Sequence, residues 1–396
     1  MAAGSLASEG LRFFAWGANS HGQLGQGHRQ DRVEPGQVEE GDPAGRALRR
    51  LAGGGGHSVL LTGAGQLLVC GQNHSGQLGL GHTREVTTFH LCPGPGGQAV
   101  EQVACGWDFT LLLTDRGTLY SCGSNAFGQL GVGRPLADSA EPLHIQSLSE
   151  RVVGLAAGLR HALAVTGSGH VFQWGTGLAA QAKRALCPNP VPAHLNAWEP
   201  CLVPGLDHVA PRGVAAGAYH CVCLTAGGDV FLWGSNKHKQ LCVSLPFLPL
   251  PRCVDRALLG GGPATAVWSG WTHLVARTDS GRVFSWGRAD YGQLGRPGDP
   301  SETGRSQPAG VPAEVDGLAG ATEIACGSEH NLAIVGGRLL SWGWNEHGMC
   351  GDGTEVNVSQ PQPIPALRGA GPLLIGCGAG HSMALCETRG APAGRP

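Results

Sequence analysis

The feature that most constrains the fold of this chain is a unit that recurs every 52 to 59 residues. Each unit carries two anchors. The first anchor is Gly-x-x-His followed by an apolar run, with histidines at His57, His161, His220, His273, His330 and His381, and with Phe109 in the same position of a seventh copy. The second anchor is a tryptophan or cysteine followed by glycine, at Trp16, Cys70, Cys122, Trp174, Trp233, Trp286 and Trp342. A fixed period of this length indicates a repeat architecture.

The spacing between the two anchors predicts a β-hairpin. The histidine position precedes the next Trp or Cys by 13 residues in five copies and by 12 in the sixth. Five copies turn with Thr-x-x-Gly, whereas the sixth has the shorter Val335-Gly336-Gly337. Each unit therefore predicts a strand, a tight glycine-containing turn and a second strand, and a further pair of strands fits in the rest of the period.

The two ends of the chain carry complementary half-units. Trp16 has no Gly-x-x-His before it, and His381 has no Trp-Gly after it. Pairing residues 13–17 with residues 382–386 completes a seventh unit and removes the exposed edges of an open array. The sequence therefore predicts an all-β fold, a seven-bladed β-propeller that is closed by its N-terminal and C-terminal strands within one blade.

The expected domain organisation follows from this ring. A single propeller spans residues 13–386, and flexible ends are expected at 1–12 and 387–396. Two segments interrupt the repeat, at about 177–213 and at about 296–320, and both are rich in proline. Long insertions in a repeat array either carry function or are tolerated loops.

Other repeat classes fit this sequence less well. WD-type repeats have a shorter period and end each unit with Trp-Asp, whereas Trp107-Asp108 is the only such pair here. Kelch repeats have a similar period, but their paired glycines followed by spaced Tyr and Trp are missing. Helical solenoids need long stretches with a period of 3.6, which these turn residues forbid.

Composition excludes several partner classes. The formal net charge is -2, and no run of Lys and Arg reaches the density of a nucleic-acid arm. No apolar run reaches membrane-spanning length, and the first residues do not resemble a signal peptide. We expect no direct nucleic-acid contact, no membrane insertion, no cofactor, and 14 cysteines that stay thiols in a reducing compartment. Because a closed ring leaves no edge that demands a partner, we expect a monomer.

The anchor residues have a structural interpretation and a functional one. Histidines that converge could hold a metal, but a ring places each of these in a different blade. We expect buried side chains that bond to a neighbouring backbone group. The Trp and Cys of the second anchor are expected between blades as core, and the recurring asparagines are expected to form turns. Those asparagines are Asn19, Asn73, Asn125, Asn236 and Asn345.

Positions that vary inside this fixed frame are the candidate binding residues. They lie between Gly and His of the first anchor or after Trp-Gly of the second, so they are expected on one rim. Trp, Tyr and Arg near acids on a rigid rim favour a protein-binding surface, although ordinary loop packing is the alternative. The candidate partner-binding residues are Trp107, Asp108, Arg160, Tyr219, Trp271, Arg288, Asp290, Tyr291, Glu329, Trp344, Glu346 and His347.

The repeated strings "WGANSHGQLGQG", "CGQNHSGQLGLG" and "CGSNAFGQLGVG", with the Gly-x-x-His anchors, closely resemble the regulator of chromosome condensation family over about residues 13–386. The strings "ACGWDFT", "WSGWTHLVA" and "SWGWNEHGMCGDGTE" look like one member that acts in secretion. The resemblance implies a guanine nucleotide exchange factor or regulator of a small GTPase, association with an exocyst subunit, and residence in cytoplasm and nucleus. It implies no catalytic residues for covalent chemistry, and no exchange residue of the chromatin-associated relative carries over by motif.

Three function classes follow. An exchange factor binds the nucleotide-free GTPase more tightly than the loaded form and needs no covalent chemistry. A scaffold would bind a GTPase-linked exocyst or trafficking complex without driving exchange. A hydrolase or metal enzyme would need convergent polar groups at the central channel, and the sequence shows no such constellation.

Overall fold

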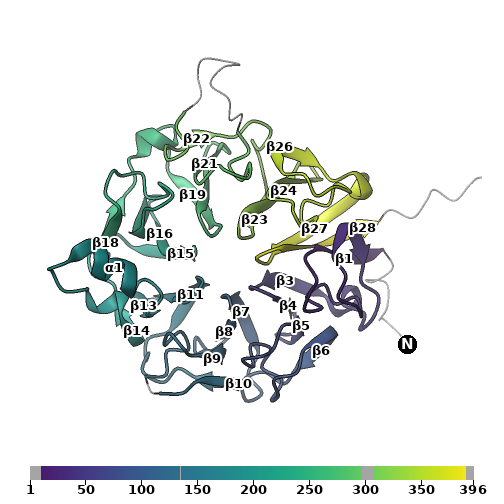
Figure 1. Cartoon of the computed structure of the whole chain (residues 1–396), viewed down its shortest axis with the longest axis horizontal. Helices are drawn as coiled ribbons and strands as arrows, with labels where there is room; N and C mark the ends of the chain where they lie inside the picture. Colours follow the sequence, from purple (N-terminus) through teal and green to yellow (C-terminus); the bar gives the residue numbers. More distant parts are fainter. Residues whose placement is uncertain (1–9, 134, 297–306, 389–396) are drawn as a thin grey trace, which may run out of the picture.

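The computed structural model describes residues 10–133, 135–296 and 307–388. In this part of the chain the strands form seven four-stranded antiparallel sheets arranged as a ring (Figure 1). The seven-bladed β-propeller that the repeat predicts is therefore confirmed. The innermost strands of adjacent sheets contact each other all the way around the centre.

Blades 1 to 3 are consecutive in the sequence. Blade 1 comprises β3 (Leu48–Gly53), β4 (His57–Thr62), β5 (Leu67–Gly71) and β6 (Val86–Cys92). Blade 2 comprises β7 (Val100–Cys105), β8 (Phe109–Thr114), β9 (Leu119–Ser124) and β10 (Asp138–His144). Blade 3 comprises β11 (Val152–Ala157), β12 (Ala162–Thr166), β13 (Val171–Gly175) and β14 (Ala197–Leu202). Each blade runs outward from the centre.

Blades 4 to 6 continue this order. Blade 4 comprises β15 (Pro211–Ala216), β16 (His220–Thr225), β17 (Val230–Ser235) and β18 (Phe247–Cys253). Blade 5 comprises β19 (Ala264–Ser269), β20 (His273–Thr278), β21 (Val283–Gly287) and the short β22 (Ala313–Glu314). Blade 6 comprises β23 (Glu323–Cys326), β24 (His330–Val335), β25 (Arg338–Gly343) and β26 (Val358–Pro363).

Blade 7 closes the ring with strands from both ends of the chain. It comprises β27 (Ala370–Cys377), β28 (His381–Thr388), β1 (Leu11–Gly17) and β2 (Arg32–Gln37). Strand β1 pairs antiparallel with β28 from Leu11 opposite Glu387 to Gly17 opposite His381. The paired segment begins two residues earlier on β1 than the sequence predicts and extends one residue further at each end on β28. The rest of the expected flexible ends, 1–9 and 389–396, lies outside the described residues.

The two irregular segments interrupt the blades without breaking the ring. Residues 177–213 contain the helix α1 (Ala179–Leu186), a 3-10 turn at Ala193–Leu195, strand β14 and the start of β15. In the second segment, residues 307–320 are described and contain β22, whereas 297–306 lie outside the described residues. The fourth strand of each of these blades is therefore still formed.

The Gly-x-x-His anchor is a turn in which the aromatic ring lies against the glycine. The Gly54 amide donates to the carbonyl of His57 at 2.9 Å, and a Cβ on Gly54 would lie 2.2 Å from Cε1 of the His57 ring. Phe109 occupies its turn in the same way, since a Cβ on Gly106 would lie 2.0 Å from Cε1 of the phenyl ring. The glycine is required because any side chain there would overlap the ring.

The six anchor histidines are fully buried and link neighbouring blades. Each uses Nε2: His57 to Thr110 Oγ1 at 2.9 Å, His161 to the His220 carbonyl at 3.3 Å, His220 to Ser269 Oγ at 2.8 Å, His273 to Asn331 Oδ1 at 2.7 Å, His330 to Ser382 Oγ at 2.9 Å and His381 to Ser58 Oγ at 2.7 Å. The partner is a side chain in five cases, where the sequence predicts a backbone group. Four of these side chains lie at the start of the adjacent blade's second strand, and the fifth, Ser269, ends the first strand of blade 5.

Burial keeps these imidazoles neutral. It lowers the pKa of His57, and the neighbouring His381 lowers it further, to about 3. The hydroxyl of Thr110 donates its own proton to the Gln77 carbonyl at 2.7 Å, so the His57 ring donates from Nε2–H. The same assignment holds for His381, because Ser58 donates to the Gln23 carbonyl at 2.6 Å. One tautomer therefore serves as an interblade donor.

The Gly-Gln-Leu-Gly motif presents a carbonyl to the next blade. The indole N–H of Trp174 donates to the Gln129 carbonyl at 3.0 Å, and that of Trp342 donates to the Gln293 carbonyl at 3.1 Å. The asparagine of the same segment holds the loop: Asn73 donates to the carbonyls of His82 and Arg84 at 2.8 and 2.9 Å. The second anchor and the motif that follows it are thus two halves of one blade junction.

Blade 3 lacks this motif and compensates with a side chain. The indole N–H of Trp233 donates at 2.8 Å to Oε1 of Gln173, which lies on β13 of the preceding blade. In blades 2, 5 and 6 the residue that aligns with Gln173 is a serine that donates to a carbonyl of its own loop, as Ser121 does to Leu130 at 2.7 Å. The longer glutamine reaches across the junction because the loop that follows β13 no longer offers a carbonyl there.

Candidate partner-binding face

All twelve candidate residues lie at one end of the blades, which we call the anchor face. This face consists of the Gly-x-x-His turns between the first and second strands of each blade and the loops between the third and fourth strands. Antiparallel pairing puts both kinds of loop at the same end of a blade. The structure thus brings the two variable sets onto one surface.

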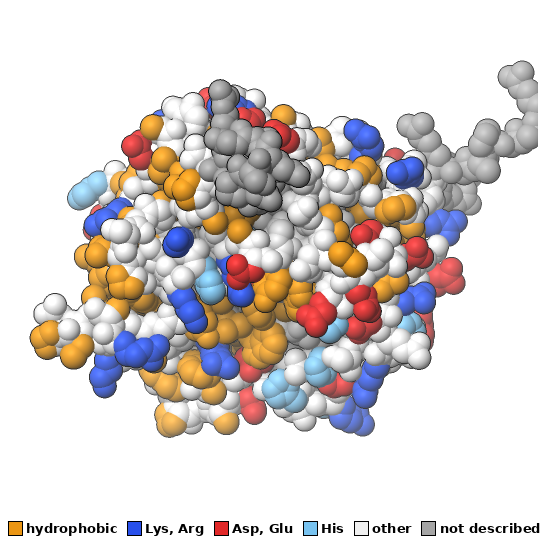
Figure 2. All heavy atoms as spheres, turned by 45° about the horizontal axis from the view of Figure 1, so that its top comes forward, with side chains coloured by type: hydrophobic (Ala, Val, Ile, Leu, Met, Phe, Trp, Pro, Cys, Tyr) orange, Lys and Arg blue, Asp and Glu red, His pale blue; other side chains and the backbone are white. Residues whose placement is uncertain are grey.

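Two tryptophans from distant blades meet over the central channel. The rings of Trp107 in blade 2 and Trp271 in blade 5 lie edge to face, with centroids 5.5 Å apart. Both line the channel mouth together with the glycines of the anchor turns, such as Gly54 and Gly378. The glycines leave room for the indoles among the turn backbones at the channel mouth. Figure 2 shows hydrophobic side chains at the floor of a hollow near the centre of this view.

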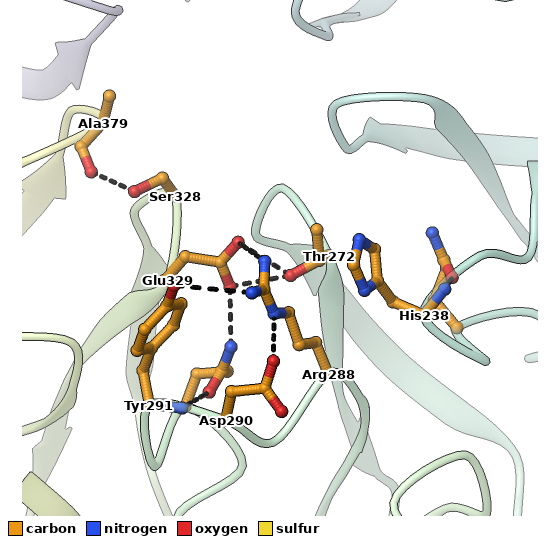
Figure 3. A network of polar contacts seen from close by, with 10 residues as sticks. His238, Thr272, Arg288, Asp290, Tyr291, Ser328, Glu329 and Ala379 are labelled. Atoms are coloured by element: carbon orange, nitrogen blue, oxygen red, sulfur yellow. Dashed lines mark hydrogen bonds and ion pairs between the residues drawn. The ribbon is translucent and has the colours of Figure 1, made fainter.

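A buried carboxylate organises the junction of blades 5 and 6 (Figure 3). Glu329 is 7% exposed. Thr272 Oγ1 donates to its two carboxylate oxygens at 2.8 and 2.7 Å, and Gln293 Nε2 donates to Oε2 at 2.7 Å. Arg288 Nη1 lies 3.9 Å from Oε1. The charge of Glu329 is compensated by these donors, as a buried carboxylate requires.

Arg288 connects this carboxylate to the surface. Its Nε donates to Asp290 Oδ2 at 2.7 Å, and its guanidinium carbon lies 4.8 Å from the centroid of the Tyr291 ring. Burial acts to lower the pKa of Arg288, but the hydrogen bond to Asp290 and the charge of Glu329 outweigh it, so the pKa is raised. The guanidinium is therefore a fixed positive charge between two acids.

The polar cluster continues across blade 6 into blade 7. The ring of Tyr291 lies 6.2 Å from that of Trp344, whose indole N–H donates to Glu346 at 3.2 Å. His347 packs edge to face on Trp344 at 5.5 Å, and its Nδ1 lies 2.9 Å from Asp31 Oδ2 of blade 7. We call this continuous surface the blade 5–7 strip. It comprises Asp31, Thr272, Arg288, Asp290, Tyr291, Gln293, Glu329, Trp344, Glu346 and His347.

Three residues of the strip, Gln293, Thr272 and Asp31, are not among the candidate residues predicted from the sequence. Gln293 belongs to a Gly-Gln-Leu-Gly motif and has a structural role in every other blade that keeps the motif. Thr272 stands between the Gly and His of an anchor, so its variable position was a usable signal. Asp31 precedes a strand in a different blade, and only the closed ring places it beside His347.

The remaining candidates lie in the other half of the ring. Asp108, Arg160 and Tyr219 belong to blades 2, 3 and 4. Burial raises the pKa of Asp108, although nearby positive charges, including that of Arg160, oppose this shift. The guanidinium carbon of Arg160 lies 4.4 Å from the ring centroid of Phe127. These residues do not join the strip, and the tryptophan pair separates the two groups.

The chemistry of this face suits binding. Among the described residues no group of three or more His, Cys, Asp or Glu side chains is arranged to hold a metal ion. All 14 cysteines are free thiols. Within residues 10–133, 135–296 and 307–388, no helix combines the length and the apolar character that crossing a bilayer requires. What the face offers is a rigid set of aromatic, acidic and basic side chains held in place by each other.

Comparison with known proteins agrees with this architecture. Residues 12–384 match the family model of the RCC1-like domain. The human protein WBSCR16 has a crystal structure that superposes with a TM-score of 0.80 at 26% identity, covering 96% of this chain and 99% of that one.

Two curated relatives are more similar in sequence. A Bos taurus protein named secretion-regulating guanine nucleotide exchange factor is 53% identical over 392 residues, which is 96% of this chain and 84% of the relative. The Mus musculus protein of the same name is 51% identical over 405 residues, covering 98% of this chain and 87% of the relative.

Proposed function

The chain belongs to the RCC1-like domain family, and from this membership we propose that it regulates a small GTPase by promoting guanine nucleotide exchange. The names of its bovine and mouse relatives support this activity and a role in secretion. The proposal needs no covalent chemistry. Tight binding of the nucleotide-free GTPase suffices, because a protein that prefers this form must weaken nucleotide binding by the same factor.

The observation that carries the proposal is the blade 5–7 strip. A partner-binding surface gains affinity when its side chains are already held in one arrangement, since little conformational freedom is then lost on binding. Here Arg288 is held by Asp290 and Glu329, and Trp344 is held between Tyr291 and His347. Arg and Trp are also the residue types that most often dominate binding energy in protein interfaces.

An exchange factor must also weaken the nucleotide site of its partner. Acidic groups do so when they compete with phosphate or attract the magnesium ion. The strip presents Asp290 and Glu346 as exposed acids on either side of the Tyr291–Trp344 pair. We expect these two carboxylates to lie nearest the phosphate end of the nucleotide site of the bound GTPase.

The test measures release of fluorescent GDP from a panel of small GTPases that includes Ran and members of the secretory pathway, with this chain in substoichiometric amount. We expect accelerated release from one member and a loss of at least tenfold in Trp344→Ala, which corresponds to about 1.4 kcal/mol of binding. Arg338→Ala, at the opposite end of blade 6, is the matched control and should leave the rate unchanged. If a folded sample accelerates release from no member of the panel, the exchange proposal is wrong and the chain acts as a scaffold that binds without driving exchange.

The finer expectations belong to the same proposal. A role in secretion, binding to an exocyst subunit, residence in cytoplasm and nucleus, and a monomeric state are predictions. Pull-down of exocyst subunits by the full chain tests the second of these. The Arg288→Ala variant tells whether an exocyst subunit and the GTPase use the same strip.

A further inference from the structure

The lysines of this chain are few and lie in one region. The 27 basic residues include only three lysines, Lys183, Lys237 and Lys239, and the other 24 are arginines. Lys183 lies on α1, and the other two lie in the loop that follows β17. All three side chains are exposed. Because α1 packs against β17 and β18, these two segments of the anchor face are neighbours.

The surroundings of these lysines lack acidic residues. Residues 176–196 and 236–246 contain no Asp or Glu, whereas Arg184 adds a fourth cation. The corresponding loop of blade 6, residues 344–357, has the opposite character, with three acids and no Lys or Arg. Figure 2 shows Lys and Arg side chains to the left of the central hollow and a group of acidic side chains directly to its right, with further Lys and Arg toward the right edge. The anchor face is therefore polarised.

Lys239 occupies a position that the fold reserves for glycine. It stands at the first glycine position of the Gly-Gln-Leu-Gly motif and has a φ of 58°, in the left-handed region. Glycine with a φ between 70° and 81° fills this position elsewhere, at Gly22, Gly76, Gly128, Gly292 and Gly348. A lysine there adopts a conformation that glycine adopts without strain. Residues held in such conformations cluster at functional sites.

An apolar groove runs beside the two lysines of this loop. It has a volume of about 530 Å³ and is lined by Lys237, Lys239, Val243, Leu245, Leu258 and Val311 among others, with no acidic residue in its described lining. The Leu245 side chain is 47% exposed. We call these six residues the lysine groove. Its size suits several side chains of a bound segment.

We propose that the lysine groove binds an acidic segment of a partner protein, with carboxylates on Lys237 and Lys239 and apolar side chains in the groove. Charge complementarity identifies the ligand: among the described residues Lys237 and Lys239 have no ion-pair partner, and the described lining of the groove contains no acid. Polyanions fit less well, because nucleic acids are typically bound by neutralising about 6–10 phosphates, and here only four cations gather. This site is separate from the blade 5–7 strip and does not depend on exchange activity.

The probe is a short fluorescein-labelled peptide in which single leucines alternate with pairs of glutamates, measured by anisotropy with the full chain. We expect binding that is about five- to tenfold weaker for the double variant Lys237→Gln, Lys239→Gln, since each exposed charge pair contributes modestly. The charge-conserving pair Lys237→Arg, Lys239→Arg should bind like the parent chain. The double variant Arg116→Gln, Arg338→Gln removes two exposed positive charges at the opposite end of the propeller and controls for net charge.

Two further measurements decide between ligand classes. A peptide with serine in place of leucine should bind at least fivefold more weakly, and heparin and anionic vesicles should show no dependence on the two lysines. The scarcity of lysine allows direct mapping: bound peptide should protect Lys237 and Lys239 from acetylation by an activated ester, with the chain's α-amino group as internal reference.

Several results would overturn the proposal. They are no peptide binding, equal binding by the glutamine variant, equal binding of the serine peptide, and protection that is absent from both lysines. Heparin or vesicle binding that requires Lys237 and Lys239 would also overturn it in favour of a polyanion or membrane surface. Circular dichroism of each variant shows that the propeller is intact.

Discussion

At the junction of blades 4 and 5, Lys239 stands in the loop position that glycine fills in five other blades, and Gly310 of the next blade packs against it. At four other junctions the first glycine of the equivalent loop, Gly22, Gly76, Gly292 or Gly348, packs on the backbone of the next blade: a Cβ on Gly76 would lie 2.3 Å from Cα of Ala140. Between blades 4 and 5 the glycine is on the other side, since a Cβ on Gly310 would lie 2.6 Å from Cβ of Lys239. At these five junctions one glycine leaves room for the close approach of the two segments.

This arrangement predicts coupled effects on stability. Lys239→Gly should raise the free energy of unfolding by about 1 kcal/mol, because a left-handed lysine is replaced by a residue that tolerates this conformation. Gly310→Ala should lower it by about 1–3 kcal/mol through overpacking against Lys239. In the Lys239→Gly background, Gly310→Ala should become nearly neutral. Urea unfolding of the four chains measures the coupling, and strictly additive effects would contradict it.

The repeat copy that has Phe109 in the histidine position predicts a second pair of substitutions with coupled effects on stability. Its apolar ring and Ala162 are fully buried in one cluster. Ala162 stands where blades 1, 2 and 7 have the hydroxyl acceptors Ser58, Thr110 and Ser382 and blade 6 has the amide acceptor Asn331. Phe109→His should cost about 1–3 kcal/mol, because a buried imidazole N–H would face a methyl group. Ala162→Ser in the same chain should recover much of this loss. Thermal and urea unfolding test it; an unrecovered loss in the double variant would show that the slot rejects histidine for another reason.

The interblade histidines predict acid sensitivity. Burial lowers the pKa of His330 to about 3, and that of His381 to about 4, whereas an unfolded histidine titrates near 6.5. Below pH 6.5 the unfolded state therefore binds more protons than the folded state, and stability falls as the pH falls toward these lowered values.

A variant isolates one histidine in this effect. His381→Phe combined with Ser58→Ala copies the Phe109–Ala162 arrangement and removes one titrating group. Its free energy of unfolding should fall less steeply between pH 6 and pH 5, by up to about 1.4 kcal/mol per pH unit. Parallel slopes for the parent and the double variant would exclude His381 as a source of the acid sensitivity.

The hydrogen bond from Trp233 to Gln173 predicts that substitution of this glutamine lowers the free energy of unfolding. Gln173→Ser introduces the residue of blades 2, 5 and 6 but leaves the buried indole N–H of Trp233 without its acceptor at 2.8 Å. The expected loss is about 1–3 kcal/mol in urea unfolding. Gln173→Glu keeps an acceptor oxygen within reach and serves as a control for length, although a buried charge adds its own cost. A neutral Gln173→Ser would mean that the loop relaxes to offer a carbonyl.

The hydrogen bond from Thr272 to Glu329 predicts that the stability of the strip depends on the threonine hydroxyl. Thr272→Val removes the hydroxyl that donates to Glu329 while conserving volume, and it should lower stability by about 1.5–3 kcal/mol, the usual range for a hydrogen bond to a charged group. Thr272→Ser keeps the donor and should retain most of the stability. If valine proved as stable as serine, Gln293 and Arg288 would suffice to hold the carboxylate.

Much of this architecture follows from the sequence alone. Two anchors at constant spacing specify a hairpin, and complementary half-units at the two ends specify closure, because an open array would leave unpaired strand edges. The chemistry of single positions is also local. A glycine three residues before His57 is needed for a ring to lie against it, and Asn73 donates to carbonyls a few residues away.

The tertiary structure decided what meets across blades. Residues in equivalent positions are predictable, but the neighbours of each depend on which blade follows and on how the ring closes. Trp107 packs on Trp271 across the channel, and His347 contacts Asp31 of the seventh blade. Gln293, a residue of the repeat motif, donates a hydrogen bond to Glu329. These contacts join residues far apart in the sequence, and side-chain reach at a packed junction, which no spacing rule encodes, determines them.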